Sequence, residues 1–299
     1  MYTHLMNVKG RNLAYTVTFG DRAENERGMQ IIGEEATRGI SVQKLRLLEQ
    51  KLVAAGTKCK LVDLSELLPG YESVPEAAVL VIYGGVNAGL GEGAEEMILE
   101  ELKSMPKDKE TLYRDQGRAW VGPKKNRYNN TMADFSQEAD LINGKGTVIN
   151  FKDYAQTNRL RGMLSGFVCA PLVAEANDYF EAERCGIGFH GDDERKIVIG
   201  VRFGAGINGM PLLFQWFKSN SEVGKMGRID LNAGDMYIMS EKAVGFDSWK
   251  EKFRPTLTLR HAAGKDSSPY PRLKRKACEE GVETYKRPRR EEEGRQHVV

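Results

Sequence analysis

The stretch GIGFHGDDERKIVIGVRF, residues 186–203, decides how this chain can fold. It holds two short apolar and β-branched runs on either side of the polar segment HGDDERK. Such runs, bounded by turn-forming and charged residues, predict two β-strands joined by a loop. His190 and Asp192 stand at the end of the first strand, where residues two apart point to the same side of an extended chain. One imidazole and one carboxylate on one face make two-thirds of a facial iron(II) site, whose full set is two histidines and one carboxylate.

Short strands are predicted on both sides of this stretch. Gly, Asn and Asp separate them, which favours a sandwich or barrel over a further strand–helix–strand layer. A helix is expected at 154–175, between the first two of these strands. The clearest strand-like runs cover residues 146–151, 186–190, 196–203, 211–217, 235–239 and 256–261.

The first 105 residues have a different pattern. Residues 12–19 and 76–83 are rich in β-branched and apolar residues and predict strands. Helical spacing of apolar residues follows each of them, at about 29–55 and at 95–104. Strand and helix in alternation predict a small α/β domain over residues 1–105, whose role the sequence leaves open.

A glycine-rich segment, GLGEGA at 89–94, fits a loose form of the dinucleotide-binding pattern. Glu92, Glu95 and Glu96 crowd the start of the helix that follows. A pyrophosphate bound there would be repelled by these carboxylates. We therefore expect a mobile loop and not a nucleotide site.

Composition and cysteine content limit the class of protein. The chain has 299 residues, and its 44 Lys and Arg nearly balance 42 Asp and Glu, so net charge does not argue for or against a nucleic-acid partner. The four cysteines are far apart, which disfavours a disulfide framework or a structural zinc site. We find neither an apolar run long enough to span a membrane nor a secretory signal. The expected location is intracellular, nuclear or cytoplasmic.

The last segment, residues 265–299, is expected to be a disordered basic tail because no apolar periodicity remains to build a core. Two basic clusters, LKRKA and YKRPRR, are separated by about ten residues. This pattern is typical of a bipartite nuclear-localisation signal, and nuclear import machinery is then a possible partner. A nonspecific nucleic-acid arm or a solvated charged tail are the alternatives.

Further motifs surround the His190 stretch in a definite order. Asn177-Asp178-Tyr179 precedes it by thirteen residues, and Arg254 and Arg260 follow on the last predicted strand. This order resembles the AlkB-like Fe(II)/2-oxoglutarate-dependent dioxygenases, in which Asn-x-Tyr precedes an H-x-D-D-E run and the closing strand carries R-x5-R. The resemblance covers roughly residues 120–264. It implies an α+β chain with a double-stranded β-helix (jelly-roll) oxygenase domain over 106–264, preceded by the small α/β domain.

The resemblance also implies roles for these residues. His190 and Asp192 would bind iron(II), while Asn177, Tyr179 and Arg254 would hold the cosubstrate 2-oxoglutarate. Arg260 would support both the cosubstrate and Asp192. A dicarboxylate suits a planar, permanently charged guanidinium, which binds a carboxylate through two hydrogen bonds.

The third iron ligand departs from the family pattern. A histidine is expected near AVGFDSW, residues 243–249, where Phe246, Ser248 and Trp249 stand instead. We expect His261 to serve. Strand alternation puts it on the opposite face from Arg260, so a bulge or strand end is needed at that point.

Two consequences stay open. In the family the cosubstrate arginine follows the distal histidine, so His261 as ligand makes Arg272 a rival to Arg254. The alternatives to His261 are a site completed by Asp247 or water, or a degenerate domain without activity.

The activity implied is hydroxylation or oxidative demethylation of a substrate, with alkylated bases in DNA or RNA as the first expectation. Lys125, Arg127 and Tyr128, with Lys124, form a basic and aromatic cluster suited to phosphates and bases. The alternatives are a protein hydroxylase on the same fold and a non-catalytic binding module with a degenerate iron site. The oligomeric state is not visible in the sequence.

Overall fold

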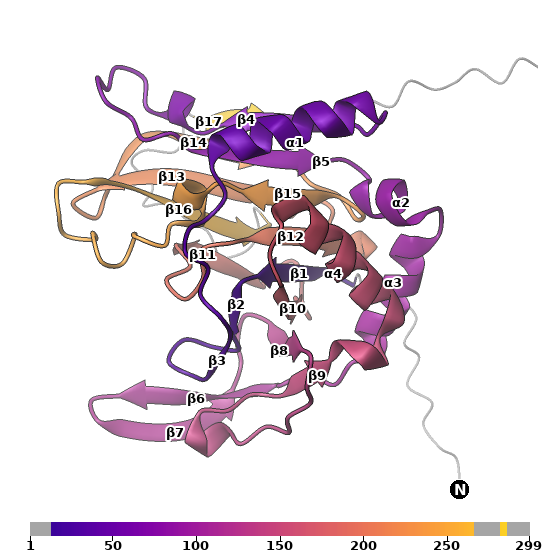
Figure 1. Ribbon diagram of the computed structural model, residues 1–299. Helices are drawn as coiled ribbons and strands as arrows, with labels where there is room; N and C mark the ends of the chain where they lie inside the picture. The colour runs from indigo at the N-terminus through magenta and orange to yellow at the C-terminus, as the bar shows by residue number, and fades with distance from the viewer. Residues whose placement is uncertain (1–12, 266–281, 286–299) are drawn as a thin grey trace, which may run out of the picture.

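The computed structural model describes residues 13–265 and 282–285, and these form a mixed α+β fold (Figure 1). Two β-sheets dominate it. The larger one, called the central sheet, has the strand order β4 (Cys59–Asp63), β5 (Ala78–Ile82), β15 (Met236–Met239), β12 (Ile199–Phe203), β1 (Tyr15–Gly20), β10 (Val173–Asp178), β8 (Tyr128–Ala133), β9 (Val148–Asn150). The second sheet has the order β11 (Gly186–His190), β16 (Leu257–Gly264), β13 (Leu212–Lys218), β14 (Ser221–Ile229), β17 (Val282–Tyr285).

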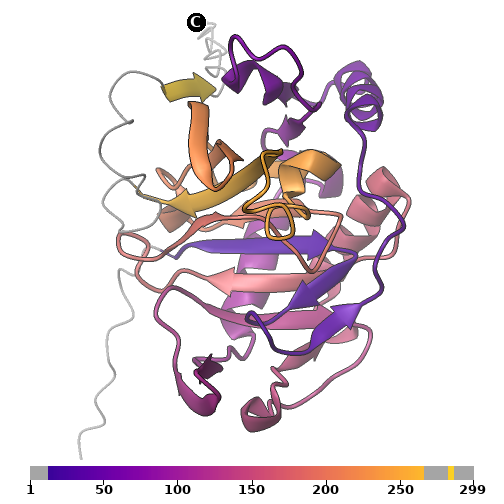
Figure 2. The same cartoon turned by 90° about the vertical axis from the view of Figure 1, so that its left-hand side faces the viewer.

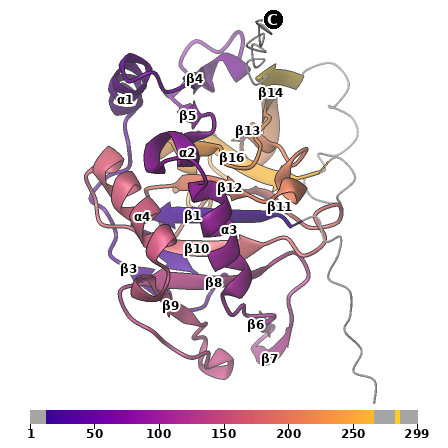
Figure 3. The same ribbon diagram turned by 90° about the vertical axis from the view of Figure 1, so that its right-hand side faces the viewer.

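Helices and two hairpins complete the described part. Figure 3 shows α3 and α4 in front of β1 and β10, with α2 above them, so these helices cover one face of the central sheet. The helices are α1 (Val42–Ala54), α2 (Gly85–Leu90), α3 (Ala94–Ser104), α4 (Ala155–Val168) and α5 (Glu241–Val244). The hairpins are β2 (Arg22–Glu24) with β3 (Ile31–Gly33), and β6 (Glu110–Asp115) with β7 (Arg118–Pro123). Short 3-10 turns lie at Ser65–Leu67, Leu141–Asn143, Phe151–Asp153 and Ala205–Ile207.

The central sheet is buried on both faces. Leu80 and Ile82 of β5 pack in a core beneath the helices, while Val79 and Val81 pack in a second core with Trp216 of the second sheet. The run AVLVI is apolar at every position because a strand covered on both sides needs no polar face. The space between the sheets is therefore an interior, and the candidate site lies at one end of it.

The N-terminal strand β1 runs through the middle of the central sheet (Figure 2, indigo). It pairs antiparallel with β10 on one side and with β12 on the other. The strands β4 and β5 belong to the same sheet. Strands β1, β4 and β5 from residues 13–105 therefore lie in one sheet with strands from residues 106–264. Local periodicity indicates which faces are buried but not which strands pair, so this arrangement could not be predicted from the sequence.

Several element boundaries also differ from the sequence expectations. The helix expected from about residue 29 begins only at Val42, because the preceding segment contains β3. The glycine-rich segment expected to be a mobile loop overlaps helix α2. The helix expected over 154–175 ends at Val168, and β10 begins at Val173.

The expected basic tail lies mostly outside the described residues. Within it, Val282–Tyr285 forms β17 and pairs parallel with β14. The two basic clusters of the suggested localisation signal flank that strand and are mostly outside the description, as is Arg272. Among the helices described, none combines the length and the apolar character that crossing a lipid bilayer requires.

Candidate metal centre

Three side chains meet at one end of the space between the sheets: His190, Asp192 and His261. His190 is the last residue of β11, and His261 lies directly opposite it on β16. The Asp192 Oδ1 atom lies 3.3 Å from His190 Nε2 and 3.5 Å from His261 Nε2. One ligand atom from each residue lies within 4.8 Å of the others. Two imidazoles and one carboxylate in this arrangement could bind a divalent metal ion.

The backbone around Gly191 permits this convergence. A side chain at Gly191 would collide with the Gly245 carbonyl oxygen, so only glycine allows the chain to pass here. The Asp192 N–H donates to the Val244 carbonyl at 3.1 Å, which holds the turn against the end of α5. The ladder between β11 and β16 also shifts register between Ile187 and His190. This irregularity lies on β11 and not near His261, where strand alternation predicts one.

Both imidazoles turn the same nitrogen toward Asp192. The His190 Nδ1 lies 2.7 Å from the Gly188 carbonyl oxygen. The Ala243 carbonyl interacts with the other side of His261, although the buried Nδ1 does not meet the geometry of a full hydrogen bond. Backbone carbonyls in this position favour a proton on Nδ1 and leave Nε2 free to bind a metal. Burial lowers the pKa of His261, which keeps this ring neutral as a metal ligand must be.

Arg195 supports the carboxylate from its far side. Its Nε lies 3.4 Å from Asp192 Oδ2, and its Nη2 lies 3.0 Å from Glu175 Oε2. Burial alone would raise the pKa of Asp192, but Arg195 and the two histidines hold it well below its usual value. Asp192 is therefore ionised, with Oδ1 facing the histidines and Oδ2 held by Arg195.

A pocket of about 290 Å³ adjoins the three ligands and lies between the two sheets. Arg202 of β12 lines it and is fully buried. Its Nη1 donates to Thr16 Oγ1 at 3.0 Å, but its Nε and Nη2 have no hydrogen-bond partner among the described residues. An unsatisfied buried guanidinium is costly, so these two donors indicate that a ligand oxygen belongs there.

Phenol groups lie beside Arg202. The Tyr237 ring centroid is 5.7 Å from the guanidinium carbon, and burial raises the pKa of Tyr237 to about 12. Tyr179 lines the same pocket, and burial also raises its pKa. Both phenols remain protonated at neutral pH and can donate to a ligand without adding negative charge.

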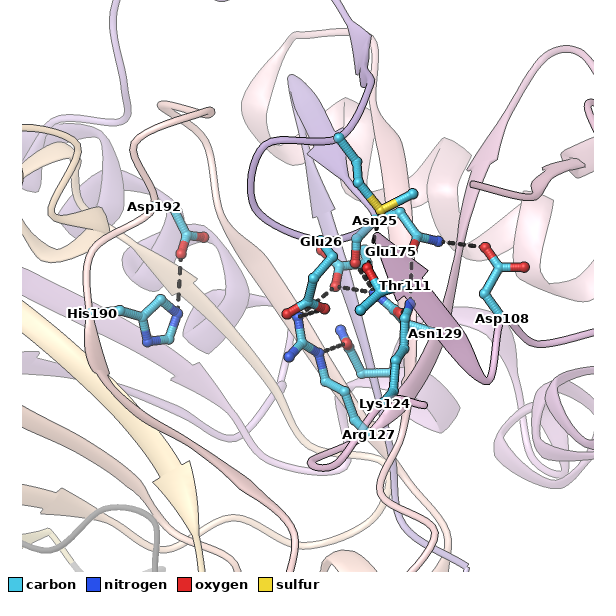
Figure 4. A network of polar contacts seen from close by, with 12 residues as sticks. Asn25, Glu26, Asp108, Thr111, Lys124, Arg127, Asn129, Glu175, His190 and Asp192 are labelled. Carbon is cyan, nitrogen blue, oxygen red and sulfur yellow. Dashed lines mark hydrogen bonds and ion pairs between the residues drawn. The ribbon is translucent and has the colours of Figure 1, made fainter. Parts of the chain in front are cut away.

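The sequence-predicted residues Asn177 and Tyr179 both lie in this pocket. Asn177 of β10 accepts a hydrogen bond from Arg127 Nε. Arg127 also lines the pocket and approaches Glu175 at 3.4 Å and Glu26 at 3.7 Å. Figure 4 shows Glu26, Arg127 and Glu175 in one polar network near His190. Arg127 thus belongs to the pocket wall, whereas the sequence predicted that it contacts phosphates or bases as part of a basic and aromatic cluster.

The predicted cosubstrate arginines are elsewhere. Arg254 is 70% exposed and pairs with Glu251. Arg260 stacks over the Phe217 ring at 4.0 Å and donates to Asn220, outside the main pocket. The sequence analysis did not identify Arg202, which is the single charged residue in the apolar strand IGVRF. Asp247, the alternative ligand, pairs with Lys242 instead of joining the three ligands.

The remaining predicted contacts form no continuous exposed patch. Lys124 is buried and donates to Asn25 and Asn129 (Figure 4). Lys125 is exposed, and Tyr128 stacks on Phe180 with 4.2 Å between ring centroids. Lys124, Lys125 and Arg127 lie in the bend between β7 and β8, where neighbouring side chains differ in burial. The order of basic residues in the sequence does not show this difference.

The fold and site define an α+β protein with a candidate centre for a divalent metal, built from two histidines and one aspartate. No family model matches the chain. It is 39% identical over 254 residues to an uncharacterized protein of Acanthamoeba polyphaga mimivirus, a match that covers 84% of this chain and 95% of the viral protein. The chain therefore belongs to the same family as that viral protein.

Proposed function

We propose that this protein is an iron(II)- and 2-oxoglutarate-dependent oxygenase of the AlkB-like kind. The observation that carries the proposal is the convergence of His190, Asp192 and His261, with ligand atoms within 4.8 Å of one another. This is the ligand set of non-haem iron(II) oxygenases. This convergence also argues against a degenerate site. The sequence has no histidine at residues 243–249, where the family pattern places the third ligand, and in this proposal His261 of β16 takes that place.

The strand order supports a double-stranded β-helix. In this proposal β15-β12-β1-β10 forms one four-stranded sheet of the jelly roll and β11-β16-β13-β14 forms the other. The N-terminal β1 supplies the strand that closes the first sheet between β12 and β10. The histidines and the aspartate then lie at the edge of the second sheet, beside a pocket that both sheets line.

We assign the cosubstrate carboxylate to Arg202. Its two unpartnered donors and its permanent charge suit one end of a dicarboxylate such as 2-oxoglutarate. The Thr16 hydroxyl accepts a hydrogen bond from the third guanidinium nitrogen, so the guanidinium group is already oriented. When bound, iron(II) with 2-oxoglutarate and dioxygen supplies oxidation of a substrate C–H bond, with release of succinate and carbon dioxide. The apolar Val198, Leu212 and Met239 limit water in the same pocket.

The test is succinate formation by purified protein given iron(II), ascorbate, 2-oxoglutarate and oxygen, without any added substrate. We expect slow turnover by the wild-type protein and none by His190→Ala or His261→Ala. Asp247→Asn is the matched control, because Asp247 is the rival acidic residue near the site and pairs with Lys242. Mn(II) binding, followed by electron paramagnetic resonance, gives a second readout. A wild-type protein that binds Mn(II) no better than His261→Ala and forms no succinate would refute the proposal.

A further inference from the structure

A buried carboxylate on the central sheet, Glu175 of β10, lies close to the candidate metal centre without belonging to it. Its Oε2 accepts a hydrogen bond from Arg195 Nη2 at 3.0 Å. Its Oε1 accepts one from Asn129 Nδ2 at 2.9 Å, and Arg127 Nη2 approaches the same oxygen at 3.4 Å (Figure 4). Both oxygens of Glu175 are therefore engaged by groups of the protein itself.

Arg195 connects Glu175 to the metal ligand Asp192. The guanidinium group contacts both carboxylates, because its Nη2 bonds Glu175 and its Nε lies 3.4 Å from Asp192 Oδ2. The other oxygen, Asp192 Oδ1, faces the two histidines. A carboxylate held in this way offers one oxygen to a metal ion and keeps the second occupied. Ligation through one oxygen leaves coordination positions open for other ligands.

Glu175 is a firmer anchor for Arg195 than the adjacent Glu194. Glu194 contacts the same guanidinium at 2.5 Å, but both residues belong to the loop between β11 and β12, so they can move together. Glu175 lies within β10, which pairs with β1 on one side and with β8 on the other. Side chains on paired strands hold their partners more precisely than side chains on loops.

The negative charge of Glu175 restrains Arg195. Burial alone would raise the pKa of Glu175, but Arg127 and Arg195 hold it below its usual value, so this carboxylate is ionised. Arg195 Nη1 has no hydrogen-bond partner within the described part of the chain. Without Glu175, the guanidinium group could turn two of its donors toward Asp192. A guanidinium bonded to both oxygens of a carboxylate would compete with a metal ion for that carboxylate.

We propose that Glu175 is a positioning residue for the metal centre. It holds Arg195 on the Oδ2 side of Asp192, so that Oδ1 stays free to bind the metal. Glu175 acts through Arg195 and does not contact the metal itself. The inference rests on the metal centre of the proposed function, but it does not depend on the oxygenase chemistry.

The test is the dissociation constant for Mn(II), measured for the full-length protein from the electron paramagnetic resonance signal of free Mn(II). We expect Glu175→Gln to weaken Mn(II) binding by roughly tenfold or more, as is typical when the partner of a metal ligand is disturbed. Glu101→Gln is the matched control. Glu101 accepts hydrogen bonds from Gln156 and Thr157 on the helix-covered face of the central sheet, so its loss should leave the Mn(II) affinity unchanged.

Removal of Arg195 as well distinguishes positioning from general structural support. If the released guanidinium group blocks Asp192, Glu175→Gln combined with Arg195→Met should bind Mn(II) more tightly than Glu175→Gln alone. General loss of structure would instead make the double variant bind no better. Circular dichroism shows whether each variant is folded. If Glu175→Gln does not fold, Glu175→Asp takes its place, because it keeps the charge but shortens the reach to Arg195 and should also weaken Mn(II) binding.

The outcomes separate this inference from the proposed function. Wild-type Mn(II) affinity in the folded Glu175 variant, or a double variant no better than the single one, would overturn the positioning role. Succinate formation by the wild-type protein beside either result would leave the oxygenase intact. Mn(II) binding that weakens in Glu175→Gln and recovers in the double variant, in a protein that makes no succinate, would support the positioning role and refute the oxygenase.

Discussion

Arg202 is held in place by contacts within the protein itself. It is fully buried, it binds Thr16 through one nitrogen, and two further nitrogens lack partners in the described chain. Burial of a charged group without full hydrogen bonding costs free energy, and a ligand carboxylate would offset that cost. If Arg202 binds the cosubstrate as proposed, function and stability are opposed at this position, as is common in binding sites.

Arg202→Met should show this opposition directly. We expect the ligand-free variant to be as stable as the wild type or more stable by about 1 kcal/mol, because an apolar side chain replaces an incompletely bonded charge. The stabilisation that 2-oxoglutarate gives the Mn(II)-loaded wild type should be lost. Urea unfolding with and without 2-oxoglutarate measures both effects. Arg254→Met is the control and should keep the ligand response; its loss there instead would return the role to Arg254.

The raised pKa of Glu24 predicts that the stability of the protein depends on pH. Burial raises the pKa of Glu24 to about 7, although the Gly28 N–H opposes this shift and the nearby Glu194 and Asp193 add to it. In the unfolded chain the same carboxyl has its ordinary pKa of 4.5. The folded state thus binds more protons in this interval, so the group's contribution is full below about pH 4.5 and is lost as the pH rises through 7.

Glu24→Gln should flatten that part of the stability curve. The neutral amide keeps an oxygen to accept from Gly28, as Glu24 Oε1 does at 2.7 Å. After allowance for partial exposure, we expect the variant to gain on the order of 1 kcal/mol over the wild type at pH 7.5 and little at pH 4.5. Urea titrations at the two pH values measure this difference. Glu110→Gln, at an exposed position, should follow the wild type; a parallel shift of both variants would contradict the assignment.

Strand β1 is the element on which the architecture depends most. It contributes Thr16 and Thr18 to the pocket and pairs with β10 and β12, so it joins strands that lie far away in the sequence. Thr16 stands opposite Asn177 on one side and opposite Arg202 on the other. One strand therefore positions two pocket residues from different neighbours.

Val17→Asp tests how much β1 contributes to the stability of the protein. Val17 is fully buried between Ala176 and Val201, so a carboxylate there would be desolvated without a partner. We expect a loss of about 4 kcal/mol in the free energy of unfolding, or failure to fold. Val53→Asp is the matched control, since Val53 is 57% exposed on α1. Thermal unfolding followed by circular dichroism compares them, and similar midpoints would show that β1 is dispensable.

The described chain is built as one unit from segments distant in sequence. The central sheet alternates strands from residues 15–82 with strands from residues 128–239. The three candidate ligands all come from residues 190–261, yet the pocket beside them is lined by Thr16, Thr18 and Glu24 as well. The site is therefore complete only when both parts are present.

A fragment of residues 106–299 should fail to fold, although it keeps every candidate metal ligand. Without β1, the edges of β10 and β12 expose unpaired backbone groups and apolar side chains. We expect poor dispersion in its NMR spectrum and no Mn(II) binding above background. Co-expression with residues 1–105 should restore both if the two parts pair in trans. A well-dispersed fragment that binds Mn(II) would show instead that the C-terminal part is an independent domain.

The features of the fold and of the candidate site that depend on neighbouring residues could be predicted from the amino-acid sequence alone. The strand ending at His190 was predicted to the residue, because alternation and turn residues are local signals. The spacing of His190 and Asp192 indicated two metal ligands on one face for the same reason. Asn177 and Tyr179 were found through a motif of three consecutive residues, and the structure brings both to the pocket.

The pairing of strands that are distant in the sequence could not be predicted in this way. The guanidinium of Arg202 meets Thr16 across 186 positions, and β1 inserts between strands that begin more than 150 residues later. Apolar periodicity indicates which side of a strand is buried. It does not identify the neighbouring strand, because any strand with a similar pattern could pair there equally well. The partner is selected by the free energy of packing the whole sheet, which depends on all strands at once. Two candidate metal ligands could therefore be predicted from one short segment, whereas the buried position of Arg202 depends on contacts with strands that are distant in the sequence.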